Sequence, residues 1–120
     1  MSLTSFMWVF LGGGLGAALR FSCFIWVGPT LFPWATLGIN IAGSFFIGLI
    51  WASCADLAWF QDWGQQFLVI GVLGGFTTFS AFSLETLQLV NDARILPALG
   101  YALGSIGVCF AAVYIGYRLG

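Results

Sequence analysis

The sequence predicts an all-α membrane protein with four transmembrane helices, the third of which is broken near its centre. Three observations predict this class. Hydrophobic residues make up 61% of the 120 residues and charged residues only 6%, which is too apolar for the interior of one small soluble domain. The apolar residues fall into runs of about 20, the length of a helix that crosses a bilayer. Glycine and hydroxyl residues occupy the middle of the third run.

Four apolar runs separated by short connections account for nearly the whole chain. Residues 1–120 are therefore expected to form a single transmembrane domain without a soluble part. The first run has no basic residue before it and exceeds the apolar part of a signal peptide, so we expect it to be retained. The segment Ala55–Gln65 is expected to be a solvated loop. The runs cover about residues 3–27, 34–54, 66–90 and 95–117.

The first run combines small residues with one arginine. Gly12 and Gly16 have the spacing that lets membrane helices approach closely, and the pairs 71/75 and 100/104 repeat it. A superficial match to a dinucleotide-binding fingerprint is rejected, because no strand precedes it and no acidic residue follows at the required distance. Arg20 has two open interpretations: it reaches the membrane surface, or it attracts anions at a pore mouth.

The second run has a small and polar stripe. Thr36, Asn40, Gly43 and Ser44 fall on one helical face. An asparagine in hydrocarbon needs hydrogen-bond partners, so the stripe either joins helices or lines a polar path.

The third run is expected to break at Gly74 and Gly75, because two glycines and three hydroxyl residues interrupt it. Irregular backbone at membrane depth persists only where protein, an ion or water satisfies its polar groups. Phe79 and Phe82 lie about one helical turn apart beyond the break and form the candidate permeation surface. Glu85 is expected near one mouth, paired with an arginine rather than carrying protons.

The last run repeats polar side chains every four residues, at Tyr101, Ser105 and Cys109. The two hydroxyls could donate hydrogen bonds along a path, and helix-to-helix contact is the competing interpretation. The three cysteines of the chain lie in or at the ends of runs, where packing is more typical than a disulfide framework.

The distribution of positive charges hardly favours either orientation of the chain in the membrane. In a four-span topology Arg118 lies on one side, Arg94 lies on the other, and Arg20 lies within the first run. This balance favours insertion in both orientations and an antiparallel dimer. The alternative is that the amino terminus or a partner orients the chain.

Composition also limits the chemistry. The chain has no histidine and only three basic residues, so neither a zinc-type site nor a nucleic-acid footprint is expected, and an enzyme is improbable. Hydroxyls, amides and the positive edges of phenyl rings suit a small anion, whereas a cation would prefer ring faces.

Three motifs on successive spans together resemble the Fluc fluoride channels, also called the CrcB family. They are Gly-Ala-x-x-Arg at 16–20, Gly-x-Asn-x-x-Gly-Ser at 38–44 and Gly-Gly-Phe-Thr-Thr-Phe-Ser-x-Phe at 74–82. The resemblance implies an antiparallel, dual-topology homodimer in the lipid bilayer of the bacterial inner membrane that passively exports fluoride.

The resemblance also implies a single channel domain and particular site residues. A structural sodium ion at the dimer centre would be held by the backbone carbonyls of Gly74 and Thr77. Ala81 and Cys109 depart from the family pattern, since a hydroxyl residue is expected at each. The fluoride pathway implied by position consists of Phe79, Phe82, Asn40, Thr36, Ser80, Tyr101, Ser105 and Arg20.

Two other functions fit a chain of this length. A small four-span proton-coupled multidrug exporter needs a buried acidic residue to exchange protons for a cation, and the first run has none. A structural or regulatory membrane subunit would transport nothing.

Overall fold

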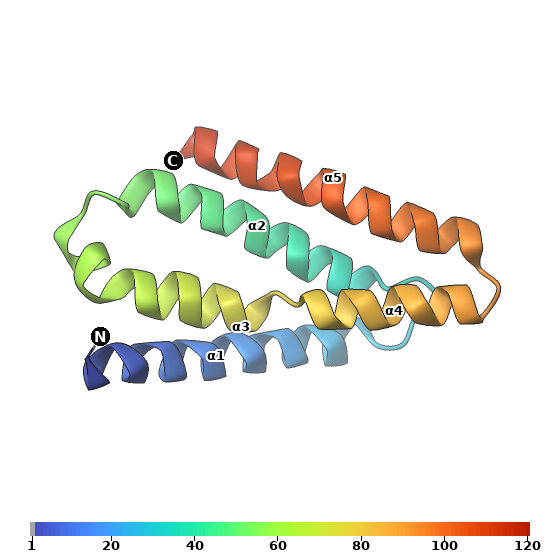
Figure 1. Cartoon of the computed structure of the whole chain (residues 1–120), viewed down its shortest axis with the longest axis horizontal. Coiled ribbons are helices and arrows are strands. Elements are labelled where there is room, and N and C mark those ends of the chain that lie inside the picture. Colours follow the sequence, from blue (N-terminus) through green and yellow to red (C-terminus); the bar gives the residue numbers. More distant parts are fainter. Residues whose placement is uncertain (1) are drawn as a thin grey trace.

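The computed structural model describes residues 2–120, in which every regular element is a helix (Figure 1). Four helical segments are long and apolar enough to cross a membrane. The predicted class, an all-α multi-pass membrane protein, is confirmed. The third segment consists of three elements. In order, the elements are α1 (Leu3–Val27), α2 (Trp34–Cys54), the π-helical η1 (Phe60–Leu73), α3 (Gly74–Phe76), α4 (Phe79–Asn91) and α5 (Ile95–Leu119).

Local sequence signals determine both ends of α1. Its first turn is capped by Ser2, whose hydroxyl oxygen accepts a hydrogen bond from the Ser5 amide at 3.2 Å. It ends at Gly28, which has a φ of 74° and donates its amide to the Phe24 carbonyl at 3.0 Å. Glycine adopts this left-handed conformation without the steric cost of a Cβ. Since α2 begins at Trp34, a short connection separates the first two spans, as their run boundaries predict.

The third span begins at Phe60, six residues before the expected boundary, so much of the expected loop is helical. The cause is a group of aromatic contacts. The Phe60 side chain is 1% exposed and packs edge-on against Trp51 at 5.9 Å between ring centroids, and Trp63 stacks on Trp8 of α1 at 4.9 Å. Asp62 is exposed in the first turn, where a negative charge suits a helix N-terminus.

Glycines bring α1 against the third span. A Cβ atom added to Gly12, Gly16 or Gly75 would lie closer than 3.0 Å to a backbone carbonyl oxygen of the facing helix. Such contacts leave no space for a side chain, which confirms the predicted role of this spacing. Gly100 and Gly104 make no such contact within the described chain, because nothing lies within 4 Å of a Cβ added at either, so their packing role stays a prediction. Both are on an exposed face of α5.

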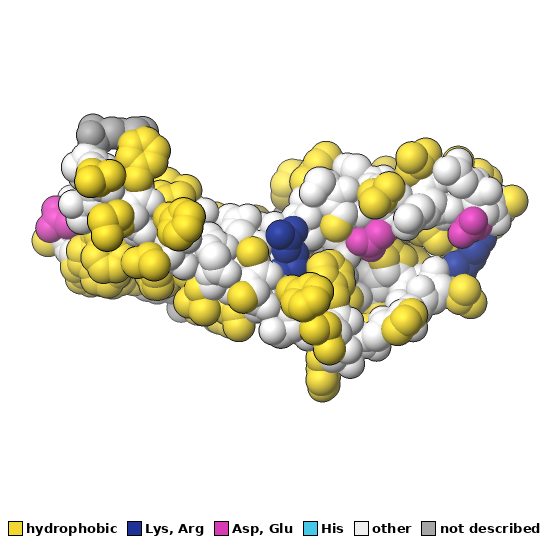
Figure 2. All heavy atoms as spheres, turned by 90° about the horizontal axis from the view of Figure 1, so that it is seen from below, with side chains coloured by type: hydrophobic (Ala, Val, Ile, Leu, Met, Phe, Trp, Pro, Cys, Tyr) yellow, Lys and Arg dark blue, Asp and Glu magenta, His cyan; other side chains and the backbone are white. Residues whose placement is uncertain are grey.

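A second close pair is formed by α2 and α5, which lie side by side in Figure 1. A Cβ on Gly48 or Gly116 would also collide with a carbonyl oxygen of the facing helix, that of Val113 or Phe45. Few large side chains are buried within the chain. Figure 2 shows a face formed mainly by hydrophobic and uncharged groups, with few and scattered charges, which is suited to contact with lipid or another membrane helix.

Candidate functional site

The backbone of the third span leaves the helical conformation at Thr77 and Thr78. Thr77 has φ −79° and ψ 155°, Thr78 has φ −150° and ψ 116°, and α4 begins at the next residue. The Thr77 amide and hydroxyl both donate to the Leu73 carbonyl, at 3.0 and 2.8 Å. Two extended residues therefore separate α3 from α4 (Figure 1).

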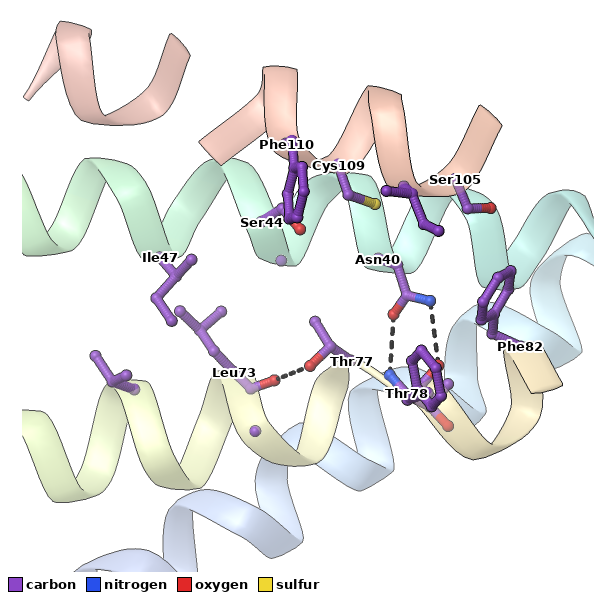
Figure 3. A pocket seen from close by; sticks show the side chains of 15 residues that line it. Asn40, Ser44, Ile47, Leu73, Thr77, Thr78, Phe82, Ser105, Cys109 and Phe110 are labelled. Atoms are coloured by element: carbon purple, nitrogen blue, oxygen red, sulfur yellow. Dashed lines mark hydrogen bonds between the residues drawn. The ribbon is translucent and has the colours of Figure 1, made fainter. Parts of the chain in front are cut away.

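Asn40 forms hydrogen bonds with the backbone of Thr78 in place of those that a continuous helix would provide. The Thr78 amide donates to Asn40 Oδ1 at 2.9 Å, and Asn40 Nδ2 donates to the Thr78 carbonyl at 3.1 Å. In a continuous α-helix this amide would bond to the carbonyl of Gly74, four residues earlier. The asparagine of the predicted stripe thus satisfies both polar backbone groups of one residue, which is 6% exposed. Figure 3 shows the paired bonds.

Thr78 is a site residue that sequence reasoning missed. Its hydroxyl oxygen accepts a hydrogen bond from the Ala81 amide at 3.1 Å, which caps the N-terminus of α4, and lies 3.3 Å from Ser80 Oγ. Threonine is a favoured residue at a helix N-cap. Its position directly after the predicted break could have identified Thr78 as the N-cap of the following helix.

A cavity of about 480 Å³ lies between α2, the third span and α5 (Figure 3). Its wall is mostly apolar. Ser44 and Cys109 also contribute to it. Six of the residues expected from the sequence line it: Asn40, Gly74, Thr77, Phe79, Phe82 and Ser105.

Aromatic rings form part of the wall of this cavity. The rings of Phe79 and Phe82 meet at 5.4 Å between centroids with an interplanar angle of 63°. Phe82 also meets the ring of Tyr101 at 5.0 Å and 69°. These edge-to-face arrangements direct positive ring edges toward negative faces. Phe79 is 76% exposed within the single chain, so its ring is available to a further partner.

Ser105 adds an unused hydroxyl to the same wall. Its side chain is 7% exposed, and its Oγ has no hydrogen-bond partner among residues 2–120. Buried hydroxyls are usually hydrogen-bonded. The cavity wall therefore includes a buried hydroxyl whose hydrogen-bonding capacity is unused.

Thr36 and Tyr101 lie apart from the cavity wall, on either side of Glu85. The Thr36 hydroxyl donates to Glu85 Oε1 at 2.6 Å, and the Tyr101 hydroxyl donates to Oε2 at 3.3 Å. Both donors are 1% exposed. The expected pairing of Glu85 with an arginine is wrong: its partners in the described chain are these two hydroxyls. They satisfy the carboxylate because the three helices α2, α4 and α5 meet here.

A second cavity, of about 370 Å³, opens beside this group and is more polar. Thr36 and Glu85 line it together with Arg94. Arg94 Nη1 donates to the Leu31 carbonyl at 2.7 Å, which ties the α4–α5 turn to the loop before α2.

Besides Tyr101, two expected pathway residues line neither cavity. Arg20 is half-buried on α1, and Ser80 is exposed on α4, where it contacts Thr78. The structure therefore does not bring the whole expected set together within one chain, and the role of Arg20 stays a prediction.

Comparison with known proteins identifies relatives along almost the full length. Residues 7–117 match the family described as CrcB-like protein, Camphor Resistance (CrcB). The chain is 43% identical to a fluoride-specific ion channel FluC of Thermus thermophilus, over 100% of this chain and 96% of that protein. It is 45% identical to the protein of the same name from Paracoccus denitrificans, over 97% and 94%. Since the match extends from the first span to the last, this chain belongs to the CrcB family.

Proposed function

We propose that this protein is a fluoride-selective ion channel that passively exports fluoride across the bacterial inner membrane and so relieves fluoride toxicity. Its relatives carry the name of fluoride-specific channels, and four spans of suitable length provide the membrane domain. The observation that carries the proposal is the cavity, whose lining brings together Ser105, with its unpartnered hydroxyl, Asn40 and the two phenyl rings.

Fluoride is small and strongly hydrated, so a pore must replace much of its water and still release the ion. The Ser105 hydroxyl supplies a donor, and the edges of Phe79 and Phe82 supply weak positive charge. No coupled ion is required, because a negative potential inside drives an anion outward by roughly 2.3 kcal/mol per charge per 100 mV.

The working unit we propose is an antiparallel homodimer. Within one chain the cavity is open, and two of its aromatic side chains, Phe79 and Phe110, are 76% and 71% exposed. Arg94 and Arg118 lie at opposite ends of α5, so the charge bias that normally fixes orientation is weak. A second copy in the opposite orientation would cover these rings and close the path.

A structural sodium ion at the dimer centre fits the backbone carbonyl oxygens at the interruption of the third span. The Thr78 amide is engaged by Asn40, so the Gly74 carbonyl loses its ordinary helical partner. The Thr77 carbonyl belongs to an extended residue. Sodium is a hard cation that prefers such oxygen ligands, and when bound it would supply positive charge that links the two subunits. Gly74 and Thr77 of each copy would hold it.

The deciding experiment measures anion efflux from liposomes that contain purified protein. Fluoride should leave rapidly and electrogenically and chloride should be retained, whereas Phe79→Ile should abolish fluoride efflux because it removes a ring from the cavity. Phe21→Ile is the matched control, since Phe21 is 65% exposed on α1 and away from the cavity. Rapid efflux through the Phe79 variant would reject the pore assignment.

The same liposomes test the alternative of a proton-coupled multidrug exporter. Glu85 is the carboxylate within a span that could carry protons, but two hydroxyls already donate to it. An exporter would move a cationic dye against a proton gradient and lose this activity in Glu85→Gln. Fluoride efflux independent of a proton gradient would exclude it.

A further inference from the structure

We propose that Cys109 is a covalent modification site inside the cavity, at which a compact thiol-reactive electrophile blocks ion passage. The proposal rests in part on the proposed function, because the blocked activity is fluoride flux. Cys109 is a free cysteine on α5 and is half-buried. It lines the cavity with Ser105, one helical turn earlier, and with Asn40 of α2.

The neighbouring residue of this wall is a serine whose buried hydroxyl is left unsatisfied, which is unusual for a buried polar group. Ser105 is 7% exposed, and its Oγ lacks a partner among residues 2–120. Figure 3 shows the Ser105 oxygen on the side of Phe82 and the Cys109 sulfur between Phe110 and Ser105, both on α5. A cavity of about 480 Å³ has room for a methylthio group beside them.

The other two cysteines provide internal controls. Cys23 lies on α1, Cys54 is the last residue of α2, and neither lines the cavity. Both are free and half-buried, as Cys109 is. The three thiols therefore differ in location more than in exposure, and the cavity thiol alone can place a modifying group beside the Ser105 hydroxyl.

Methyl methanethiosulfonate is a suitable probe, because it is small and uncharged. The cysteine thiolate attacks the sulfenyl sulfur of the reagent, a new sulfur–sulfur bond forms, and methanesulfinate leaves with the electron pair of the broken bond. The thiol proton passes to water. The product carries an apolar methyl disulfide in place of an S–H donor, and dithiothreitol restores the thiol by exchange.

Block follows from the chemistry of the wall. A partly dehydrated anion needs donors to replace its water. The methylthio group removes one donor and fills space next to the Ser105 hydroxyl. We expect fluoride efflux to fall by about tenfold or more on modification, and to recover on reduction.

The experiment compares two variants in liposomes, each measured before and after the reagent. The double variant C23S/C54S retains only the cavity thiol. Intact mass measurement should show one methylthio group added to it, with reversible loss of fluoride efflux. The variant C109S retains the other two thiols, and its own rate of efflux should not respond to the reagent.

Two results would overturn the inference. One is a C23S/C54S protein that gains no methylthio group under conditions that label the same protein after detergent unfolding. The other is a fully modified protein whose fluoride efflux is unchanged. Failure of the proposed function is distinguishable, because unmodified protein would then conduct no fluoride at all while mass measurement still reports access to Cys109.

Discussion

Replacing Asn40 by alanine tests whether its side chain supports the extended residues of the third span. The change removes both hydrogen bonds to Thr78, at 2.9 and 3.1 Å, and leaves that residue's amide and carbonyl without partners. Double-mutant cycles in membrane proteins average about 0.6 kcal/mol per side-chain hydrogen bond, so two bonds set a lower estimate of about 1 kcal/mol. Leaving a buried polar group unsatisfied costs roughly 1–3 kcal/mol, so two such groups set an upper estimate of about 6 kcal/mol.

We expect a loss near the middle of this range, because Thr78 is 6% exposed and lies in a mostly apolar cavity wall. A loss of about 3 kcal/mol corresponds to a decrease in Tm on the order of 10 °C for a chain of this size. The assay is thermal unfolding in detergent followed by tryptophan fluorescence, since the chain has six tryptophans. Fluoride efflux from liposomes should fall in parallel.

Ser44→Ala is the control, because Ser44 lies one turn further along the same face of α2 and lines the same cavity. Its Tm should change much less. An Asn40→Ala protein with the Tm and fluoride efflux of the parent would refute the reasoning, because the extended segment would then hold its shape without the asparagine.

Two further substitutions test other contacts. Gly16→Ala places a Cβ closer than 3.0 Å to the Val72 carbonyl oxygen and should lower the free energy of unfolding by about 1–3 kcal/mol. The control Gly14→Ala, whose Cβ faces open space, should be neutral or slightly stabilising in the same thermal scan. Equal Tm values for the two variants would contradict the described packing. Glu85→Ala leaves two buried hydroxyls without their acceptor and should cost about 1–3 kcal/mol. Asp62→Ala is the exposed control, and a Glu85 variant as stable as that control would show that the hydroxyls find other partners.

The sequence predicted the features that follow from local composition. Hydropathy located the four spans because each apolar run is by itself long enough to cross the bilayer. The position of Asn40 on a polar face was predictable from helical periodicity, whereas its partner Thr78 was not. That pairing joins residues 38 positions apart, and only the packing of α2 against the third span selects it.

The predictions that the structure contradicts share one cause, which is contact between residues that are far apart in the sequence. The polar residues around Phe60 predict a loop, yet its contact with Trp51 extends the helix. Glu85 is expected from its charge to find an arginine, but Thr36 is 49 residues away along the chain and adjacent in space. The packing role of Gly100 and Gly104 is a different case: it stays a prediction, because their face meets no other helix of the described chain.

The glycine contacts between α1 and the third span have a mechanical consequence. They clamp η1 and α3 backbone to backbone against α1, whereas α4 packs mainly against α5 and leaves many apolar side chains exposed. The two halves of the span are therefore held in different ways: the first by backbone contacts with α1, and the second by side chains, including the bonds from Thr36 and Tyr101 to Glu85. Amide hydrogen exchange in the separated chain should therefore be slower in η1 and α3 than in α4, and a second copy that covers Phe79 should slow exchange in α4 most.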